Sequence, residues 1–223
     1  MARRRKNSLR PNFAFMIIVI EGISAAGKTT YSRKIGMRYC VPEIPAKGER
    51  PGEDGSLQEH ALFWANHNAA RFQMAMEIEA QYGFAICDTD PMKVHYSWSM
   101  ERAGFHWPDK FESAIPAVRQ AIQERRLGFA DRYYVKRIDA KTARMQKEGD
   151  LARSRGNFDQ HLALQPHLID WFRALSDILP RKVEFAFPDP ANLLSQLESK
   201  TPEDNPRRFD TSIFDALIER LPT

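Results

Sequence analysis

The sequence predicts a single α/β domain in which helices cover both faces of a five-stranded parallel sheet. Short apolar runs alternate along the chain with longer helical stretches, as happens when parallel strands are joined by helices. The first apolar run, at residues 13–20, leads directly into a glycine-rich loop and then into a helix. The length of 223 residues also suits one compact domain. We therefore expect a three-layer α/β/α arrangement.

Five segments have the apolar character of strands. The first contains Ile17, Ile18, Val19 and Ile20 without interruption, which is typical of a parallel strand buried on both faces. The second stops at Pro42, which donates no backbone hydrogen bond, so we expect it at an edge of the sheet. The expected strands cover residues 13–20, 39–41, 84–87, 131–138 and 183–187.

Helical segments separate these strands. A helix at 57–82 should end at Gly83, and a helix opening at Pro91 has its proline in the first turn, where no donor is lost. Residues 191–223 should hold one or two short helices, the clearer one beginning after Asp210 as its N-cap. The other expected helices run from the glycine-rich loop to about 39 and over 91–103, 108–126, 141–149 and 158–179.

The charge is distributed unevenly. The chain has 33 Lys and Arg against 29 Asp and Glu, a net charge of +4. Five basic residues precede residue 12, and the remainder has 28 basic against 29 acidic residues. We expect a basic, disordered tail at 1–12, a main domain at 13–190 and a C-terminal helical extension at 191–223. The nearly neutral main domain argues against nucleic acid as a partner.

Several classes of protein are disfavoured. Cys40 and Cys87 lie far apart and form no C-x-x-C pair, which argues against a disulfide framework or a zinc site. The six histidines show no metal-ligand spacing, and we assign them no function. The first residues imitate a signal peptide, but Glu21 and the glycine-rich loop follow at once, so we expect a cytoplasmic protein. The apolar run of eight residues is too short to span a membrane.

Residues 22–29 carry the strongest functional motif. They match G-x-x-x-x-G-K-[ST] between a buried strand and a helix, which is the setting of a phosphate-binding loop. The backbone of such a loop points N–H groups at phosphate oxygens, Lys28 reaches the β and γ phosphates, and the Thr29 hydroxyl binds Mg²⁺. A chance match is the alternative, but strand, loop and helix agree, so ATP and Mg²⁺ are the expected cofactors. The expected phosphate-binding residues are Gly22, Ile23, Ser24, Ala25, Ala26, Gly27, Lys28, Thr29 and Thr30.

A carboxylate after a later strand belongs to the same expected site. Asp88 follows the apolar strand at 84–87, in the pattern of an acid that binds Mg²⁺ or orients a substrate beside the loop. Its alternative role is to cap the helix that opens at Pro91, for which Asp90 is the better candidate. Thr29 and Asp88 are thus the expected metal ligands.

Residues 18–30, IVIEGISAAGKTT, resemble the opening strand and loop of the deoxynucleoside kinases and, slightly less, those of the thymidylate kinases. Both families have the Glu-Gly pair, and Ala-Ala-Gly-Lys is typical of the former. A weaker likeness extends to about Phe187. The resemblance implies a P-loop NTPase fold and Mg²⁺-ATP-dependent kinase activity. It also implies that Glu43 takes the proton from a sugar 5′-hydroxyl, and that Phe72 and Gln73 match a segment whose glutamine hydrogen-bonds the base.

The residues themselves leave these roles open. Glu43 is the first carboxylate after a strand expected near the loop, as a general base must be, but a solvated loop acid has the same pattern. Gln73 borders an apolar helical stripe, where it can read a base or be exposed. Aromatic residues at helical spacing are more often core than stacking surface. The candidates for stacking are Trp64, Phe72, Tyr96 and Trp98. The expected substrate-binding residues are Glu43, Trp64, Phe72, Gln73 and Asp88.

A lid is expected at 141–158. Arg144, Arg153 and Arg155 flank a polar loop there, which is similar to the lid that nucleoside and nucleotide kinases close over the phosphates. Its arginines would stabilise transition-state charge, and its closure would exclude water. A solvated charged loop is the alternative. The expected catalytic residues are Lys28, Glu43, Asp88, Arg144, Arg153 and Arg155.

Two departures from the family bear on the acceptor. The strand end Asp88-Thr89-Asp90 lacks the arginine that the family has there, and the lid pattern is loosened at 153–156. The missing arginine weakens the case for a nucleoside monophosphate. We predict phosphoryl transfer from Mg²⁺-ATP to a hydroxyl of a small molecule, foremost a nucleoside or an analogue. A monophosphate, a sugar or an antibiotic is the rival acceptor. A regulatory or DNA-associated ATPase is the further alternative, and a homodimer stays open.

Overall fold

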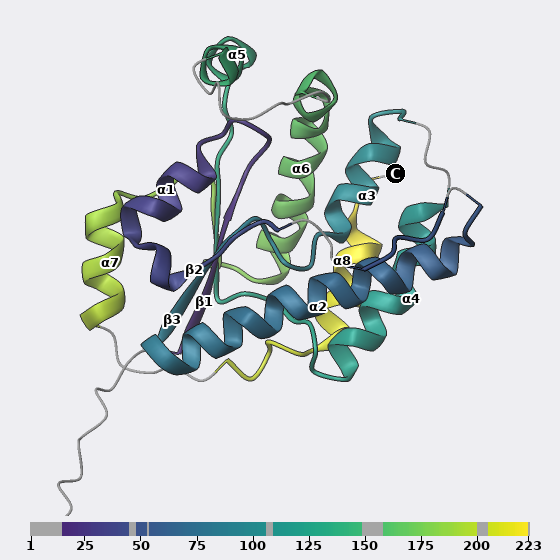
Figure 1. Cartoon of the computed structure of the whole chain (residues 1–223), viewed down its shortest axis with the longest axis horizontal. Helices are drawn as coiled ribbons and strands as arrows, with labels where there is room; N and C mark the ends of the chain where they lie inside the picture. Colours follow the sequence, from purple (N-terminus) through teal and green to yellow (C-terminus); the bar gives the residue numbers. More distant parts are fainter. Residues whose placement is uncertain are drawn as a thin grey trace, which may run out of the picture.

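A five-stranded parallel sheet forms the centre of the protein (Figure 1). The computed structural model describes residues 15–44, 48–52, 54–105, 109–148, 158–199 and 205–222. The strands are β1 (Met16–Glu21), β2 (Cys40–Val41), β3 (Phe84–Asp88), β4 (Arg132–Val135) and β5 (Val183–Glu184). Every strand pair is parallel, in the order β2-β3-β1-β4-β5. The expected α/β class with five parallel strands is therefore confirmed.

Helices connect the strands and cover both faces of the sheet (Figure 1). In the described ranges they are α1 (Lys28–Ile35), α2 (Leu57–Tyr82), α3 (Val94–Arg102), α4 (Lys110–Gln123), α5 (Ala140–Glu148), α6 (Phe158–Ile178), α7 (Pro190–Ser199) and α8 (Thr211–Arg220). None of these helices combines the length and the apolar character needed to cross a membrane.

Two hydrophobic cores join the layers, one on each face of the sheet. Side chains of a strand alternate between its faces. Ile17 and Val19 therefore pack with side chains of α2, α3, α4, α6 and α8, while Ile18 and Ile20 pack with side chains of α1 and α7. All of β1 is buried. Burial on both faces explains why this strand has a continuous apolar run in the sequence.

The ends of several elements follow the sequence expectation. Ser56 accepts a hydrogen bond from the Glu59 N–H, and the Glu59 carboxylate accepts one from the Ser56 N–H, so a capping box begins α2. Gly83, at φ 86°, ends the same helix. β2 is an edge strand. Asp210 caps α8, because its carboxylate accepts the Ser212 N–H at 3.0 Å.

The segment after β3 differs from the expectation. The helix expected from Pro91 begins at Val94, as α3. Asp90 does not cap it; the Asp90 carboxylate accepts the Met92 N–H at 3.0 Å and closes a turn instead. Lys93 then takes a left-handed conformation, φ 45°, which a right-handed helix cannot contain. This turn brings Lys93 to the cavity described below.

Three other elements are shorter than expected. α1 ends at Ile35 because Gly36 takes φ 135°, and a single 3₁₀ turn, Met37–Tyr39, leads into β2. β4 and β5 stop well before residues 138 and 187. The residues that follow these two strands reach the cavity as loops, since Lys136 and Phe187 both line it.

A buried ion cluster ties the C-terminal segment to the sheet. Arg208 donates to the Glu79 carboxylate of α2 at 2.6 and 2.8 Å and to Asp131 at 2.6 Å. Asp131 also accepts the Ile17 N–H of β1 at 2.7 Å. Gly128 permits this approach, because a Cβ there would lie 2.6 Å from the Arg208 carbonyl oxygen. Together with α7 and α8, which contribute side chains to the two cores, this cluster makes the C-terminal segment part of the main packing.

Candidate nucleotide and acceptor site

The loop between β1 and α1 depends on its glycines. Gly22 has φ 153°, and a Cβ there would lie 2.8 Å from the Lys136 carbonyl oxygen and 2.9 Å from the Cβ of Ala26. Gly27, at φ 85°, precedes α1, and Ala25 also has a positive φ of 69°. The curled backbone places the N-terminus of α1 at a cavity. Helix N-termini of this kind attract anions.

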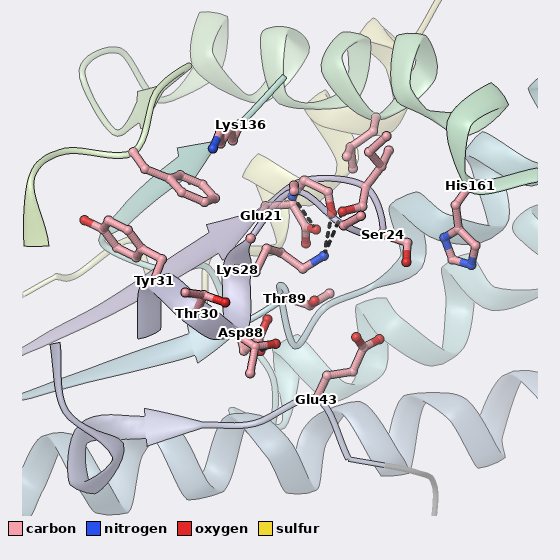
Figure 2. Close-up of a pocket in the computed structure, with 18 of the residues that line it drawn as sticks. Glu21, Ser24, Lys28, Thr30, Tyr31, Glu43, Asp88, Thr89, Lys136 and His161 are labelled. Carbon is pink, nitrogen blue, oxygen red and sulfur yellow. Dashed lines mark hydrogen bonds between the residues drawn. The ribbon is translucent and has the colours of Figure 1, made fainter. Parts of the chain in front are cut away.

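The Lys28 ammonium lies over this loop. Its Nζ donates hydrogen bonds to the carbonyl oxygens of Gly22 at 2.6 Å and Ile23 at 3.3 Å (Figure 2). A phosphate oxygen would compete with these carbonyls for the same donor. Because a charged acceptor forms the stronger hydrogen bond, Lys28 can turn from the loop to a bound phosphate.

Thr29 and Asp88 meet although 59 positions separate them in the chain. The Thr29 hydroxyl donates to Asp88 Oδ2 at 2.6 Å. The other carboxylate oxygen, Oδ1, is buried and has no hydrogen-bond partner among the described residues. Burial raises the pKa of Asp88 above its ordinary value, against the opposing effects of the Thr29 hydrogen bond and the Lys28 charge. Asp88 therefore has an oxygen available for a cation, which would return its pKa toward the usual range.

The Thr29 and Asp88 oxygens fit a magnesium ion. Mg²⁺ takes oxygen ligands and is usually held by one or two carboxylates together with water and substrate phosphates. Over the ranges that the structure describes, no group of three or more His, Cys, Asp or Glu side chains could hold a metal. A metal at this site would thus rely on phosphate and water oxygens as well, which is how a nucleotide-bound Mg²⁺ is held.

Glu43, just after β2, lines the same cavity and pairs with Lys93. The Glu43 side chain is 47% exposed. Its partial burial by itself raises the pKa, but Lys93, and then Lys28 and Arg71, outweigh that effect and lower the pKa of Glu43 to about 2. Glu43 is therefore ionised at neutral pH. In Figure 2 its carboxylate points toward the loop.

Glu21, at the end of β1, joins the loop to the turn after β3. One carboxylate oxygen accepts the Gly22 N–H and the other the Asp90 N–H, both at 2.9 Å. Burial raises the pKa of Glu21. Burial, together with the charge of Glu21, also raises the pKa of Asp90 to about 7. The Nε2 atom of His95 lies 3.6 Å from Glu21, and burial lowers the pKa of His95 to about 3. His95 is therefore uncharged at neutral pH.

Arg71 of α2 supports the turn after β3 from behind. Its guanidinium is 1% exposed and donates to the carbonyl oxygens of Asp88 at 2.9 Å and Thr89 at 3.1 Å. Thr89 has φ 75°, which is rare for a β-branched residue. Arg71 lies outside the cavity lining. It holds the end of β3 in place and so fixes where Asp88 lies.

These groups surround one cavity of about 1130 Å³. Small-molecule sites measure roughly 300–1,000 Å³, so this cavity is slightly larger than is usual. In Figure 2, Tyr31 and Lys136 lie on one side of Lys28, and Glu43 and His161 lie on the other. The cavity therefore has two ends, with the loop between them.

Comparison with protein families and with curated proteins gives no assignment for this cavity. No protein-family model matches the chain, and no curated protein matches it either. Its chemistry therefore has to follow from its own residues.

Three expected substrate-binding residues lie outside the cavity lining. Phe72 is 1% exposed and belongs to the core. Gln73 is exposed and donates to Glu77 on the solvent side of α2. Trp64 packs instead against the Arg50 guanidinium, at 4.8 Å from the ring centre. Neighbouring residues of a helix point about 100° apart, so α2 turns Phe72 toward the core and Gln73 toward solvent.

The structure describes one of the three arginines expected in the lid. Arg144 lies on α5 with an exposed side chain and is not part of the cavity lining, whereas Gln146 of the same helix is. Arg153 and Arg155 lie outside the described residues, as does the rest of 149–157. Their role in closing a lid therefore stays a prediction.

Several lining residues are missed by the sequence analysis. Lys136 follows β4, and its Nζ lies 5.5 Å from the centre of the Phe187 ring. The Tyr31 ring lies 4.9 Å from the same phenyl ring. The place of Lys136 in the cavity could have been predicted, because it follows a parallel strand and the carboxyl ends of such strands meet at one edge of the sheet. No sequence pattern predicts the place of His95 and His161, since helix packing alone brings them to the cavity.

Proposed function

We propose that this protein is a P-loop kinase that transfers the γ-phosphoryl group of Mg²⁺-ATP to a hydroxyl of a small molecule, foremost a nucleoside or an analogue. The observation that carries the proposal is the hydrogen bond of 2.6 Å between Thr29 and Asp88, next to the Lys28 loop. This arrangement places the Lys28 ammonium, a cation for phosphates, beside two oxygen ligands for Mg²⁺, those of Thr29 and Asp88. Phosphoryl transfer depends chiefly on such groups, because its catalysis is mostly positioning and charge stabilisation.

The residues of the chain divide this work. The backbone of 22–27 and the Lys28 ammonium would hold the triphosphate, and Thr29 and Asp88 would hold the metal. Bound Mg²⁺ would neutralise charge on the β and γ phosphates. Tyr31 and Lys136, at the other end of the cavity from Glu43, would face the rest of the nucleotide.

Glu43 would orient the acceptor hydroxyl. The hydroxyl oxygen attacks the γ phosphorus, a new P–O bond forms, and the bond to the β–γ bridging oxygen breaks, so that ADP leaves with that electron pair. The hydroxyl proton passes to the Glu43 carboxylate. With a pKa of about 2, Glu43 is a weak base. A weak base can still act here, since phosphoryl transfer has a loose transition state and depends chiefly on how the attacking hydroxyl is positioned.

The cavity favours a transferase over a hydrolase. Glu43 lies at the end of the cavity away from Tyr31 and Lys136, so the cavity extends beyond the phosphate loop on the side where an acceptor would bind. A monophosphate, sugar or antibiotic kinase would use the same phosphate side and a different acceptor. A DNA-associated ATPase would draw on the basic residues 1–12, which lie outside the described ranges.

Two substitutions test the two halves of this proposal. Lys28→Ala should weaken binding of a fluorescent ATP analogue by about 100-fold or more, since a charged contact to phosphate is lost. Glu43→Gln should leave that affinity within about twofold and lower phosphoryl transfer by about 100-fold, the usual contribution of a positioned proton acceptor. Binding is read by fluorescence titration with Mg²⁺, and transfer by ADP release with a panel of nucleosides, nucleotides and sugars.

Arg220→Ala is the control for Lys28→Ala. It removes a cation at the end of α8, outside the cavity lining. It should change neither readout. Full ATP turnover in Lys28→Ala would refute the nucleotide site. Unchanged transfer in Glu43→Gln would remove Glu43 from the reaction.

A further inference from the structure

α3 packs against α6 at the end of the cavity that contains Glu43. Figure 2 shows His161 of α6 facing the cavity beyond Ser24, as seen from Lys28. We name this region the acceptor slot. It is lined by Tyr96 and Ser99 of α3 and by Phe158, His161, Leu164 and Leu168 of α6.

The slot offers flat and apolar surface. The rings of Tyr96 and His161 lie 5.8 Å apart between centroids and are tilted by 39°. Leu164 and Leu168 add buried aliphatic side chains. Rings and aliphatic groups of this kind bind the faces of a planar ring. A sugar alone would leave such surface uncovered.

The described ionisable residues that line this end are neutral or already paired. Burial, together with the charges of Lys28 and Lys93, lowers the pKa of His161, and burial lowers that of His95 to about 3. Both imidazoles are therefore uncharged at neutral pH. Lys93 forms its ion pair with Glu43. A ligand at this end meets neutral hydrogen-bonding groups and a compensated charge pair, which favours an uncharged ring.

Three buried polar atoms at the cavity have no hydrogen-bond partner among the described residues. They are Ser99 Oγ, His95 Nδ1 and Thr89 Oγ1, on residues that are 1%, 3% and 5% exposed. All three residues line the cavity. Buried polar atoms are rarely left unpaired in folded proteins, so a partner from a ligand or an ordered water is expected here.

We propose that the acceptor slot binds the ring of the phosphate acceptor, an uncharged planar heterocycle with hydrogen-bonding groups along its edge, as in a nucleoside. The ring packs against Tyr96 and His161 and turns its edge toward Ser99. The hydroxyl of the sugar that is attached to this ring reaches Glu43. This inference rests on the proposed kinase function, and it gives ring recognition to α3 and α6 in place of Gln73 on α2.

Steady-state kinetics with defined acceptors test the slot. Adenosine, guanosine, cytidine, uridine and their 2′-deoxy forms, together with thymidine, are compared with their 5′-monophosphates and with ribose, each with Mg²⁺-ATP. At least one nucleoside should be phosphorylated about 10-fold more efficiently than its monophosphate and than ribose. With that nucleoside, His161→Leu and Tyr96→Leu should raise the acceptor KM about 10-fold or more and leave the ATP KM within twofold.

His167→Leu is the matched control. His167 lies on the same helix, with its ring 6.0 Å from Trp98 and outside the cavity lining, so its loss should not change the acceptor KM. Ser99→Ala is a second, smaller change that keeps the core filled. It should alter the ranking of the nucleosides, because only an edge contact is removed.

Several results would overturn the slot. One is a preference for monophosphates or ribose over nucleosides. Another is an acceptor KM that stays unchanged in His161→Leu, Tyr96→Leu and Ser99→Ala but rises in Gln73→Ala. Binding of the ATP analogue to the unaltered protein separates this failure from that of the proposed function. If the analogue does not bind, or if it binds and no acceptor is phosphorylated, the kinase proposal fails; if it binds and a monophosphate or ribose is phosphorylated but no nucleoside is, only the slot fails.

Discussion

Lys93 illustrates how single residues set the charge of the site. The strand end Asp88-Thr89-Asp90 has no arginine, and Lys93, in its left-handed turn, supplies the cation beside Glu43. The pair lowers the pKa of Glu43 and leaves no unpaired charge on Lys93 at this end of the cavity. Because the Glu43 side chain is 47% exposed, the pair should add at most about 1 kcal/mol to stability. Its role is therefore expected in the reaction rather than in folding.

Lys93→Met should change the pH dependence of the reaction. The pKa of Glu43, about 2 with Lys93 present, should rise toward the ordinary carboxylate value when this cation is removed. A lowered pKa favours the ionised form, which is lost as pH falls through that pKa. The acid limb of kcat/KM should therefore move upward by about one to two pH units. A ¹³C NMR titration of the Glu43 carboxylate between pH 2 and 7 measures the shift of this pKa in both proteins, and superimposable titration curves would contradict it.

At the scale of elements, buried ion pairs of Arg208 hold the C-terminal segment against the sheet. Arg208 connects α2 with the segment before β4, and its partners Glu79 and Asp131 are 7% and 9% exposed. Burial raises the pKa of Glu79 despite its bond to Arg208. Breaking such a cluster from one side is costly, because it leaves unpaired charge in the interior.

Arg208→Met should lower the free energy of unfolding by about 3–5 kcal/mol, since Glu79 and Asp131 would stay buried without their cation. Urea denaturation at pH 7 measures the loss. The neighbouring Arg207→Met is the control. Arg207 is half exposed and lies 3.8 Å from Asp210, so the change there should stay within about 0.5 kcal/mol. Equal effects of the two substitutions would show that the cluster does not stabilise the fold.

At the scale of the whole molecule, the C-terminal helices complete both cores. α7 covers one face of the sheet together with α1, and α8 packs between α4 and α6 on the other (Figure 1). Ile213, Phe214 and Leu217 of α8 are buried among residues of the central core. The described residues of the expected C-terminal extension therefore pack as part of the main domain.

Truncation after residue 204 should abolish cooperative unfolding, because it removes Arg208 and the apolar face of α8 at once. Deletion of residues 1–12 should instead leave Tm within about 2 °C and the catalytic rate unchanged. Thermal melts followed by circular dichroism compare the two proteins. A cooperative melt at the original temperature after the C-terminal truncation would show that α8 is dispensable.

Some of the site follows from the sequence and some does not. The meeting of Thr29 and Asp88 could be expected, because both follow parallel strands whose carboxyl ends share one edge of the sheet. Glu43 reaches the cavity for the same reason, after β2. Gln73 does not, since the rotation of α2 about its axis decides which side chains face inward, and one residue changes that direction by about 100°.

The sequence by itself determined the local features: the doubly buried strand β1, the glycine-dependent loop, the cap of α8 by Asp210 and the end of α2 at Gly83. Each depends on the chemistry of neighbours in the chain. Only the tertiary structure decided that Lys93 pairs with Glu43, and that Tyr96 and His161 face each other across α3 and α6. Such contacts depend on how helices pack, which sums many weak interactions between residues distant in sequence.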